Sequence, residues 1–147
     1  MRIVGLAGIA LGIAVLVGAT MFARWAGLSG GLPRIAGDLF INAGPVDKLG
    51  IMVLALTTVV ATIMAAISIA SGGRSEVSEA LGPLSLIAPL FGAVVAAYGY
   101  WFIHVAADAT HTTNLMIMAP SIAEDTLALG LGLLAGGVAA LPRRGRT

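Results

Sequence analysis

The chain alternates between long apolar runs and shorter polar segments, and the apolar runs exceed what the core of a small soluble domain requires. Four such runs occupy residues about 3–22, 49–70, 82–106 and 115–141. Each is close to or above the roughly 20 residues that an α-helix needs to cross a hydrocarbon core of about 30 Å. The pattern predicts an all-α integral membrane protein, with four transmembrane helices in a single membrane domain and no large cytoplasmic domain.

The composition supports the same class. Of the 147 residues 59% are hydrophobic and only 10% are charged, and the mean hydropathy is +1.01. A soluble domain has about 45–50% apolar and about 25% charged residues. The net charge of +1 and the lack of a basic aromatic patch argue against nucleic-acid binding. The chain has no cysteine, which excludes disulfides, thiolate metal sites and cysteine nucleophiles.

Metal binding has little support in the sequence. The two histidines, His104 and His111, are too few for a histidine cage without carboxylates. Asp108 and His111 together would supply only two ligands. No arrangement of a nucleophile and a base is evident, so we expect a protein that is not an enzyme and has neither metal nor cofactor.

The first apolar run has two interpretations. Residues Ile3 to Ala23 form 21 positions without a charge, which is longer than the roughly 7–15 apolar residues of a signal peptide. No convincing cleavage site follows. A retained transmembrane helix is the preferred interpretation, and a cleaved signal peptide is the alternative.

The basic residues predict the orientation. With both termini inside, the inner side carries five of them and the outer side three: Arg2, Arg74, Arg143, Arg144 and Arg146 inside; Arg24, Arg34 and Lys48 outside. An excess of Lys and Arg marks the cytoplasmic side, so we expect both termini there. The outer segment 24–48 is divided by prolines and glycines and shows no catalytic pattern.

Small residues recur every four positions on the third and fourth runs. The third run has a row that ends in polar side chains: Ala88, Gly92, Ala96, Tyr100, His104 and Asp108. The fourth has a row that begins with an acid: Glu124, Ala128, Gly132, Gly136 and Ala140. Small side chains let helices approach closely in lipid. We expect helix packing at Gly92, Ala96, Ala128, Gly132 and Gly136, and we expect Glu124 on the same close-packed face.

Two adjacent acids, Glu124 and Asp125, interrupt the fourth run. Ionisable residues inside membrane segments are rare and often functional. Pro120 leaves the depth of the pair open. A helix that begins near Asn114 puts Glu124 about 15 Å along its axis, near the middle of the membrane, whereas a helix that begins at Pro120 puts it near the mouth.

These acids suit a proton relay, because a relay needs groups that exchange protons away from bulk water. Adjacent residues point about 100° apart, so Glu124 is expected to face the interior of an oligomer and Asp125 a neighbouring helix or subunit. Thr126 is a possible pore hydroxyl. His104 and Asp108, one turn apart, are candidates for the outer mouth. The structural alternatives are an interhelical hydrogen bond for Glu124, helix stabilisation for Asp125, and packing or solvated positions for His104 and Asp108.

A stretch of the chain resembles the MotA/TolQ/ExbB proton-channel family, and ExbB proteins most of all. The signal is TTNL at residues 112–115 followed by APSIAE at residues 119–124, together with small-residue and proline matches from Ala88 to Leu133. By this resemblance Ala96 and Leu129 stand where the family has pore threonines. The short loop 71–81 stands where ExbB proteins have a large cytoplasmic domain.

The resemblance implies a homo-oligomer, a pentamer in this family, in the inner membrane. It also implies a single-span ExbD/TolR-like partner, with which proton flow is coupled to energy transduction. The function predicted from the sequence is therefore that of a proton-channel subunit. The alternatives are a non-conducting structural or accessory subunit of a larger membrane complex, and an unrelated four-helix transporter or membrane enzyme.

Overall fold

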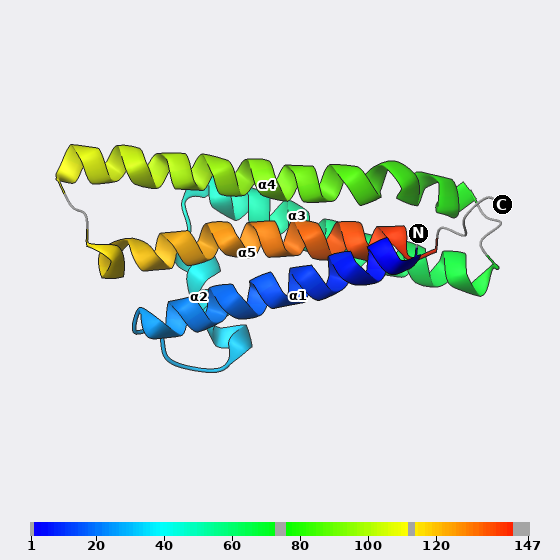
Figure 1. Ribbon diagram of the computed structural model, residues 1–147, viewed down its shortest axis with the longest axis horizontal. Coiled ribbons are helices and arrows are strands. Elements are labelled where there is room, and N and C mark those ends of the chain that lie inside the picture. Colours follow the sequence, from blue (N-terminus) through cyan, green and yellow to red (C-terminus); the bar gives the residue numbers. More distant parts are fainter. Residues whose placement is uncertain (1, 73–75, 112–113, 143–147) are drawn as a thin grey trace.

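The computed structural model describes residues 2–72, 76–111 and 114–142, and within these ranges all regular structure is helical. Five helices follow one another: α1 (Arg2–Trp25), α2 (Leu32–Asn42), α3 (Pro45–Ala70), α4 (Glu76–Thr110) and α5 (Leu115–Ala140) (Figure 1). All except α2 are long and apolar enough to cross a membrane. The prediction of a four-helix, multi-pass membrane protein is thereby confirmed as far as length and composition can show it.

The four long helices alternate in direction. The start of α1 and the end of α5 lie together, while the α1–α2–α3 connections, the end of α4 and the start of α5 lie at the opposite end, here called the α2 end (Figure 1). Four helices that alternate in direction cross a membrane an even number of times, which would leave the start of α1 and the end of α5 on the same side. The sidedness of the membrane stays a prediction, because Arg74, Arg143, Arg144 and Arg146 lie outside the described residues.

Helix α5 lies at the centre of the bundle and contacts α1, α2, α3 and α4. The described residues show no contact between α1 and α3 or between α1 and α4, so α5 holds the bundle together. Its helix begins directly after Asn114, whose side chain accepts a hydrogen bond of 3.0 Å from the Met116 amide. Pro120 lies inside the helix, which decides between the two predicted starting points in favour of Asn114.

Glycines allow two helices to approach α5 at backbone distance. On the α4 side, a Cβ at Gly92 would lie 3.0 Å from the Gly132 Cα. On the α1 side, a Cβ at Gly12 would lie 2.7 Å from the Leu134 amide nitrogen, and one at Gly137 would lie 2.5 Å from the Ile9 amide nitrogen. Each of these positions has room for a hydrogen atom only, which explains why small residues line both contacts.

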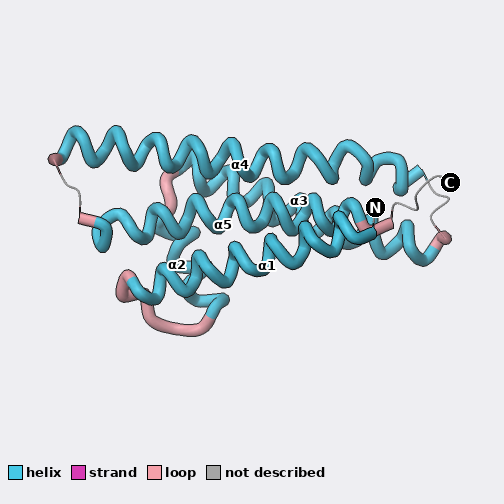
Figure 2. Tube along the Cα trace, in the orientation of Figure 1, coloured by secondary structure: helices cyan, strands magenta, loops and turns pink. Residues whose placement is uncertain are grey.

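Helix α2 was not predicted as a helix. Its sequence, LPRIAGDLFIN, carries a proline and a glycine that suggest a loop, but the proline stands in the first helical turn, where it is tolerated. Ile35 and Leu39 are buried on α2 and pack against Ala23 of α1 and Ala123 of α5. The helix therefore covers one end of the bundle (Figure 2).

Helix α4 is longer than predicted. Its 35 residues span about 52 Å. It extends beyond the predicted range 82–106 at both ends, and at its start it continues through Pro83, which the helix accommodates. The last turns of α4 and the first turns of α5 project together at the α2 end (Figure 1).

The α3 threonines bond to their own helix. The hydroxyls of Thr57, Thr58 and Thr62 donate to the carbonyls four residues earlier, at 2.7, 2.8 and 2.7 Å.

Candidate functional site

The two acids of α5 are buried by the helices of their own chain. Glu124 is 6% exposed and Asp125 is 2% exposed. Within the single chain, helices already cover Glu124, and the expectation that this residue faces the interior of an oligomer stays a prediction. The functional role of the pair is a separate question and stays a prediction.

Asp125 is the acid that faces α4. Its carboxylate lies against the backbone of Gly99, where an added Cβ would collide with both carboxylate oxygens. Asp125 Oδ2 is buried and has no hydrogen-bond partner within the described residues. Glu124 was expected on a close-packed face, and it is buried. The acid that lies against α4 is nevertheless Asp125, because four residues turn a helix by about 400°, so an i+4 row drifts by about 40° at each step.

Glu124 interacts with charged groups in the first turn of α3. Asp47 and Lys48 both interact electrostatically with Glu124, and Asp47 also interacts with Asp125. Asp47 is half-buried, and its Oδ1 is buried without a hydrogen-bond partner within the described residues. Three carboxylates and one ammonium group thus gather between α3, α4 and α5; we call Asp47, Lys48, Glu124 and Asp125 the charged cluster.

The sequence analysis missed Asp47 and Lys48 as members of a site. They were assigned to a polar outer segment, and more than 70 positions separate them from Glu124. A usable signal was present: Pro45 precedes a charged pair that opens an apolar run, which is typical of a first helical turn. Only the packing of α3 on α5 brings that turn to the acids.

Thr126 connects α5 to α4 beside the cluster. The Thr126 hydroxyl and the Tyr100 hydroxyl are 2.9 Å apart. The Thr126 hydroxyl donates to the Ile122 carbonyl at 2.7 Å, so its oxygen is available to accept the proton of the Tyr100 hydroxyl. This pair is the direct side-chain hydrogen bond between the two helices on the described part of the chain.

His104 and Asp108 lie away from the acids. Both are exposed on α4, about 6 and about 12 Å beyond Tyr100 along the helix axis, toward the α2 end. His111 is also exposed and has a positive φ of 52°. No group of three potential metal ligands occurs among the described residues, and Thr112 and Thr113 of the TTNL run lie outside them.

The predicted packing residues sit between α4 and α5. Gly92 and Ala96 are buried on α4, and Ala128, Gly132 and Gly136 are buried on α5. A Cβ at Gly92 would lie 2.9 Å from the Ala128 carbonyl oxygen. Leu129, the second position where the family has a threonine, is half-buried.

The charged cluster lies at one end of the uncharged stretches of α1 and α3, which together define an apolar slab across the bundle. The uncharged stretch of α3 from Leu49 to Ala70 has 22 residues, about 33 Å, and that of α1 from Ile3 to Ala23 has 21 residues, about 31 Å. Each matches a hydrocarbon core of about 30 Å. Both stretches end at the level of the cluster, since Ala23 packs on Ala123 and Asp47 lies beside Glu124.

Exposed aromatic side chains lie near the same level, three of them on α4 and one at the end of α1. Trp25 and Trp101 are exposed by 58% and 60%, and Tyr98 and Tyr100 by 40% and 38%. Trp and Tyr favour the boundary between hydrocarbon and headgroups. We infer that the cluster lies at this boundary, enclosed by protein, and not at the centre of the membrane.

The comparisons with known proteins leave this site without a counterpart. No protein family matches the chain, and no curated protein or solved structure is significantly similar to it.

Proposed function

We propose that the chain is a proton-channel (motor) subunit of the ExbB/TolQ kind in the inner membrane, which couples proton flow to energy transduction. The observation that supports it most is the burial of two carboxylates, Glu124 and Asp125, inside an otherwise apolar bundle, with the half-buried Asp47 interacting with both. Burying a carboxylate without full hydrogen bonding is unfavourable. Groups retained at such a cost are candidates for proton exchange.

The partners in this proposal follow from the resemblance of residues 112–124 to ExbB proteins. They are further copies of the chain, in a pentamer, and a single-span ExbD/TolR-like protein. The exposed apolar faces of α3 and α4 leave ample surface for lipid and for such partners.

The charged cluster supplies the proton-binding groups. Glu124 and Asp125 hold protons, and Asp47 extends the group to α3. The pair of Tyr100 and Thr126 lies between the acids and the exposed end of α4, where His104 and Asp108 would exchange protons with the aqueous phase. Because Glu124 is only 6% exposed, conduction requires water or a partner helix to reach it.

A flux measurement tests the proposal. Proteoliposomes containing the chain together with its co-purified partner are given a potassium diffusion potential, and proton entry is followed with an internal pH dye. Glu124→Gln and Asp125→Asn should each lower the flux to that of empty vesicles, with the complex intact. Glu79→Gln, at an exposed position on α4, should leave the flux unchanged. Normal flux in both acid variants would overturn the proposal.

The second candidate function is a non-conducting structural or accessory subunit of a larger membrane complex. The tight packing of Gly92 against Gly132 and Ala128 favours it, as does the burial of Ala96, which is 3% exposed where the family has a pore hydroxyl. In that case Glu124→Gln would leave both the complex and its cellular activity intact.

A further inference from the structure

The carboxyl group of Asp125 is almost completely enclosed, although one of its oxygens is unsatisfied. The residue is 2% exposed, and its carboxylate lies against the backbone of Gly99 on α4. Asp125 Oδ2 accepts no hydrogen bond from the described residues. Most buried polar groups are hydrogen-bonded, so an unsatisfied one needs an explanation. A carboxyl group that receives its partner only when its enclosure opens would have these properties.

The hydrogen bond between Tyr100 and Thr126 closes the seam between α4 and α5 beside this carboxyl group. Gly99, which the Asp125 carboxylate touches, directly precedes Tyr100 in α4, and Thr126 directly follows Asp125 in α5. Each step is about 1.5 Å along a helix axis, so the two contacts lie at the same level. Successive residues point about 100° apart, which directs Thr126 to one flank of the seam. Because Tyr100 is 38% exposed, this flank is at the surface.

Tyr100 is the part of this closure that can move. Its hydroxyl is 2.9 Å from that of Thr126, and its ring has no stacking partner among the described residues, unlike the ring of Tyr98, which stacks on Phe102. The Thr126 hydroxyl is fixed to its own helix by the 2.7 Å bond to the Ile122 carbonyl. Exposed side chains change rotamer within picoseconds to nanoseconds, so one hydrogen bond is the main obstacle to opening.

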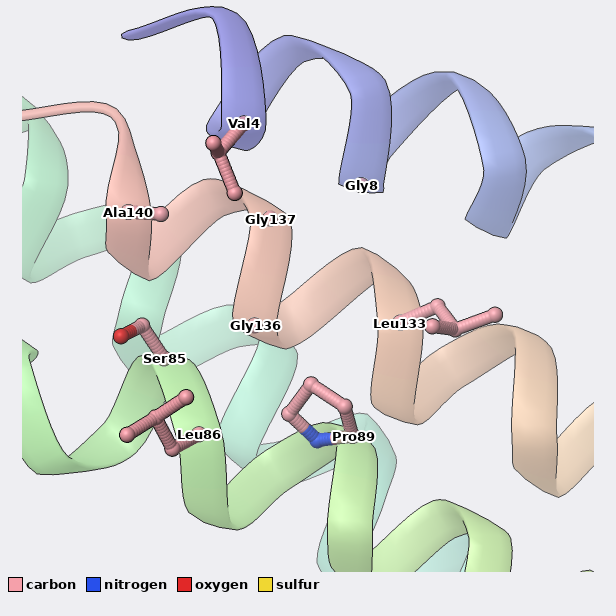
Figure 3. A pocket seen from close by; sticks show the side chains of 9 residues that line it. All are labelled: Val4, Gly8, Ser85, Leu86, Pro89, Leu133, Gly136, Gly137 and Ala140. Atoms are coloured by element: carbon pink, nitrogen blue, oxygen red, sulfur yellow. The ribbon is translucent and has the colours of Figure 1, made fainter. Parts of the chain in front are cut away.

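The glycine-rich part of the α4–α5 contact opens less easily. The backbone of Gly92 packs on that of Gly132, and the Pro89 ring lies against Gly136 (Figure 3). These contacts are made by backbone atoms and a rigid ring, so they open only when the two helices separate.

Neither of two hollows on α5 leads to Asp125. One, of about 230 Å³, lies near the start of α1 and the end of α5, with Val4 and Leu86 among its lining residues. The other, of about 660 Å³, lies between α1 and α3, and its α5 residues are Leu127 and Leu131. Asp125 lines neither. The flank at Tyr100 is therefore the route to this carboxyl group that needs the least rearrangement.

We propose that the hydrogen-bonded pair of Tyr100 and Thr126 is a latch over Asp125, and that proton exchange at Asp125 requires the latch to open. In the closed state Tyr100 donates to Thr126, and the carboxyl group has no access to water. When the Tyr100 side chain rotates outward, the flank of the seam opens and water reaches Asp125 Oδ2. The regulation of conduction by this latch rests on the proposed channel function, whereas the enclosure of Asp125 does not.

Cysteine labelling tests the latch, because the natural chain has no cysteine to remove. In nanodiscs, full-length Asp125→Cys should react with N-ethylmaleimide far more slowly than Asp108→Cys, which is at an exposed position of α4. Adding Tyr100→Phe removes only the hydroxyl and should raise the rate at position 125 about 2- to 10-fold, the factor that corresponds to the net free energy of one hydrogen bond. Adding Tyr98→Phe, the matched control, should leave the rate unchanged.

A double variant separates the latch from a general loosening of the helices. Thr126→Val removes the other hydroxyl and should accelerate labelling of Asp125→Cys to the same extent as Tyr100→Phe. The two changes together should be no faster than either alone, because a single bond can be lost only once. Additive effects, an unchanged rate in Tyr100→Phe, or labelling of Asp125→Cys as fast as that of Asp108→Cys would each overturn the proposal.

The native carboxyl group gives a second measurement that does not replace Asp125. The protein is treated with dicyclohexylcarbodiimide, an apolar reagent for carboxyl groups, and peptide mass spectrometry distinguishes labelled Asp125 from labelled Glu124. Labelling of Asp125 should rise in Tyr100→Phe and not in Tyr98→Phe, and equal labelling in both would contradict the latch. Neither measurement needs a proton gradient or a partner protein, so failure of the latch and failure of the proposed channel are distinguishable.

Discussion

At the scale of single residues, the contact of Gly99 with Asp125 is the most sensitive point of the cluster. Gly99→Ala would place a methyl group against the Asp125 carboxylate, and overpacking of this kind costs about 1–3 kcal/mol. We expect that loss in the free energy of unfolding, measured by titration with a denaturing detergent. Gly18→Ala, where an added Cβ meets nothing within 4 Å, is the control. If Asp125→Ala does not restore stability in the Gly99→Ala background, the clash is not the cause.

The hydroxyl of Tyr100 makes a weaker contribution. Tyr100→Phe removes its hydrogen bond to Thr126 but leaves the bond from Thr126 to the Ile122 carbonyl. We expect a loss of about 0.5–1.5 kcal/mol in the free energy of unfolding. Tyr98→Phe is the matched control, because the Tyr98 hydroxyl makes no hydrogen bond to the described residues. Equal losses in the two variants would show that the 2.9 Å contact adds nothing.

At the scale of helices, the docking of α1 depends on glycine. Gly12→Leu places a branched side chain where even a Cβ would lie 2.7 Å from the Leu134 amide nitrogen, so α1 must separate from α5. We expect reduced disulfide cross-linking between cysteines introduced at Val4 of α1 and Ala140 of α5, which both line a hollow between α1, α4 and α5. Gly18→Leu faces open space and should cross-link normally. Unchanged cross-linking in Gly12→Leu would show that α1 does not need this close approach.

Hydrophobic patterning predicted the four long helices because lipid imposes an apolar run of fixed length on each. It missed α2, whose helix is stabilised by burial of Ile35 and Leu39 against α1 and α5 and not by local signals. It found Glu124 and Asp125 because acids stand out in apolar runs. It could not add Asp47, because the interaction of Asp47 with the acids depends on how α3 packs on α5. It could not show that Asp125 is the acid against α4, because an i+4 row drifts around a helix.

At the scale of the whole molecule, the depth of the charged cluster in the membrane decides which path a proton would take to reach it. A cluster at the centre of the membrane would need access from both sides. From a cluster at the α2 end, the path outward is short and passes the pair of Tyr100 and Thr126. The path to the opposite side of the membrane is long and runs through the Gly- and Ala-rich half of α5. In the proposed channel, the inward path, where Gly92 and Gly132 are in contact, would be the barrier to conduction.

Cysteine accessibility measures this level directly, because the natural chain has no cysteine to remove. Single cysteines at Val105 and Asp108, beyond the aromatic residues of α4, should react with a membrane-impermeant maleimide added on the α2 side of sealed vesicles. Cysteines at Leu90 and Val94, which are exposed on the same helix but lie within the apolar slab, should be protected from either side. Protection that extends through Val105 and Asp108 would place the cluster about 12 Å deeper, and the short outward path would then be wrong.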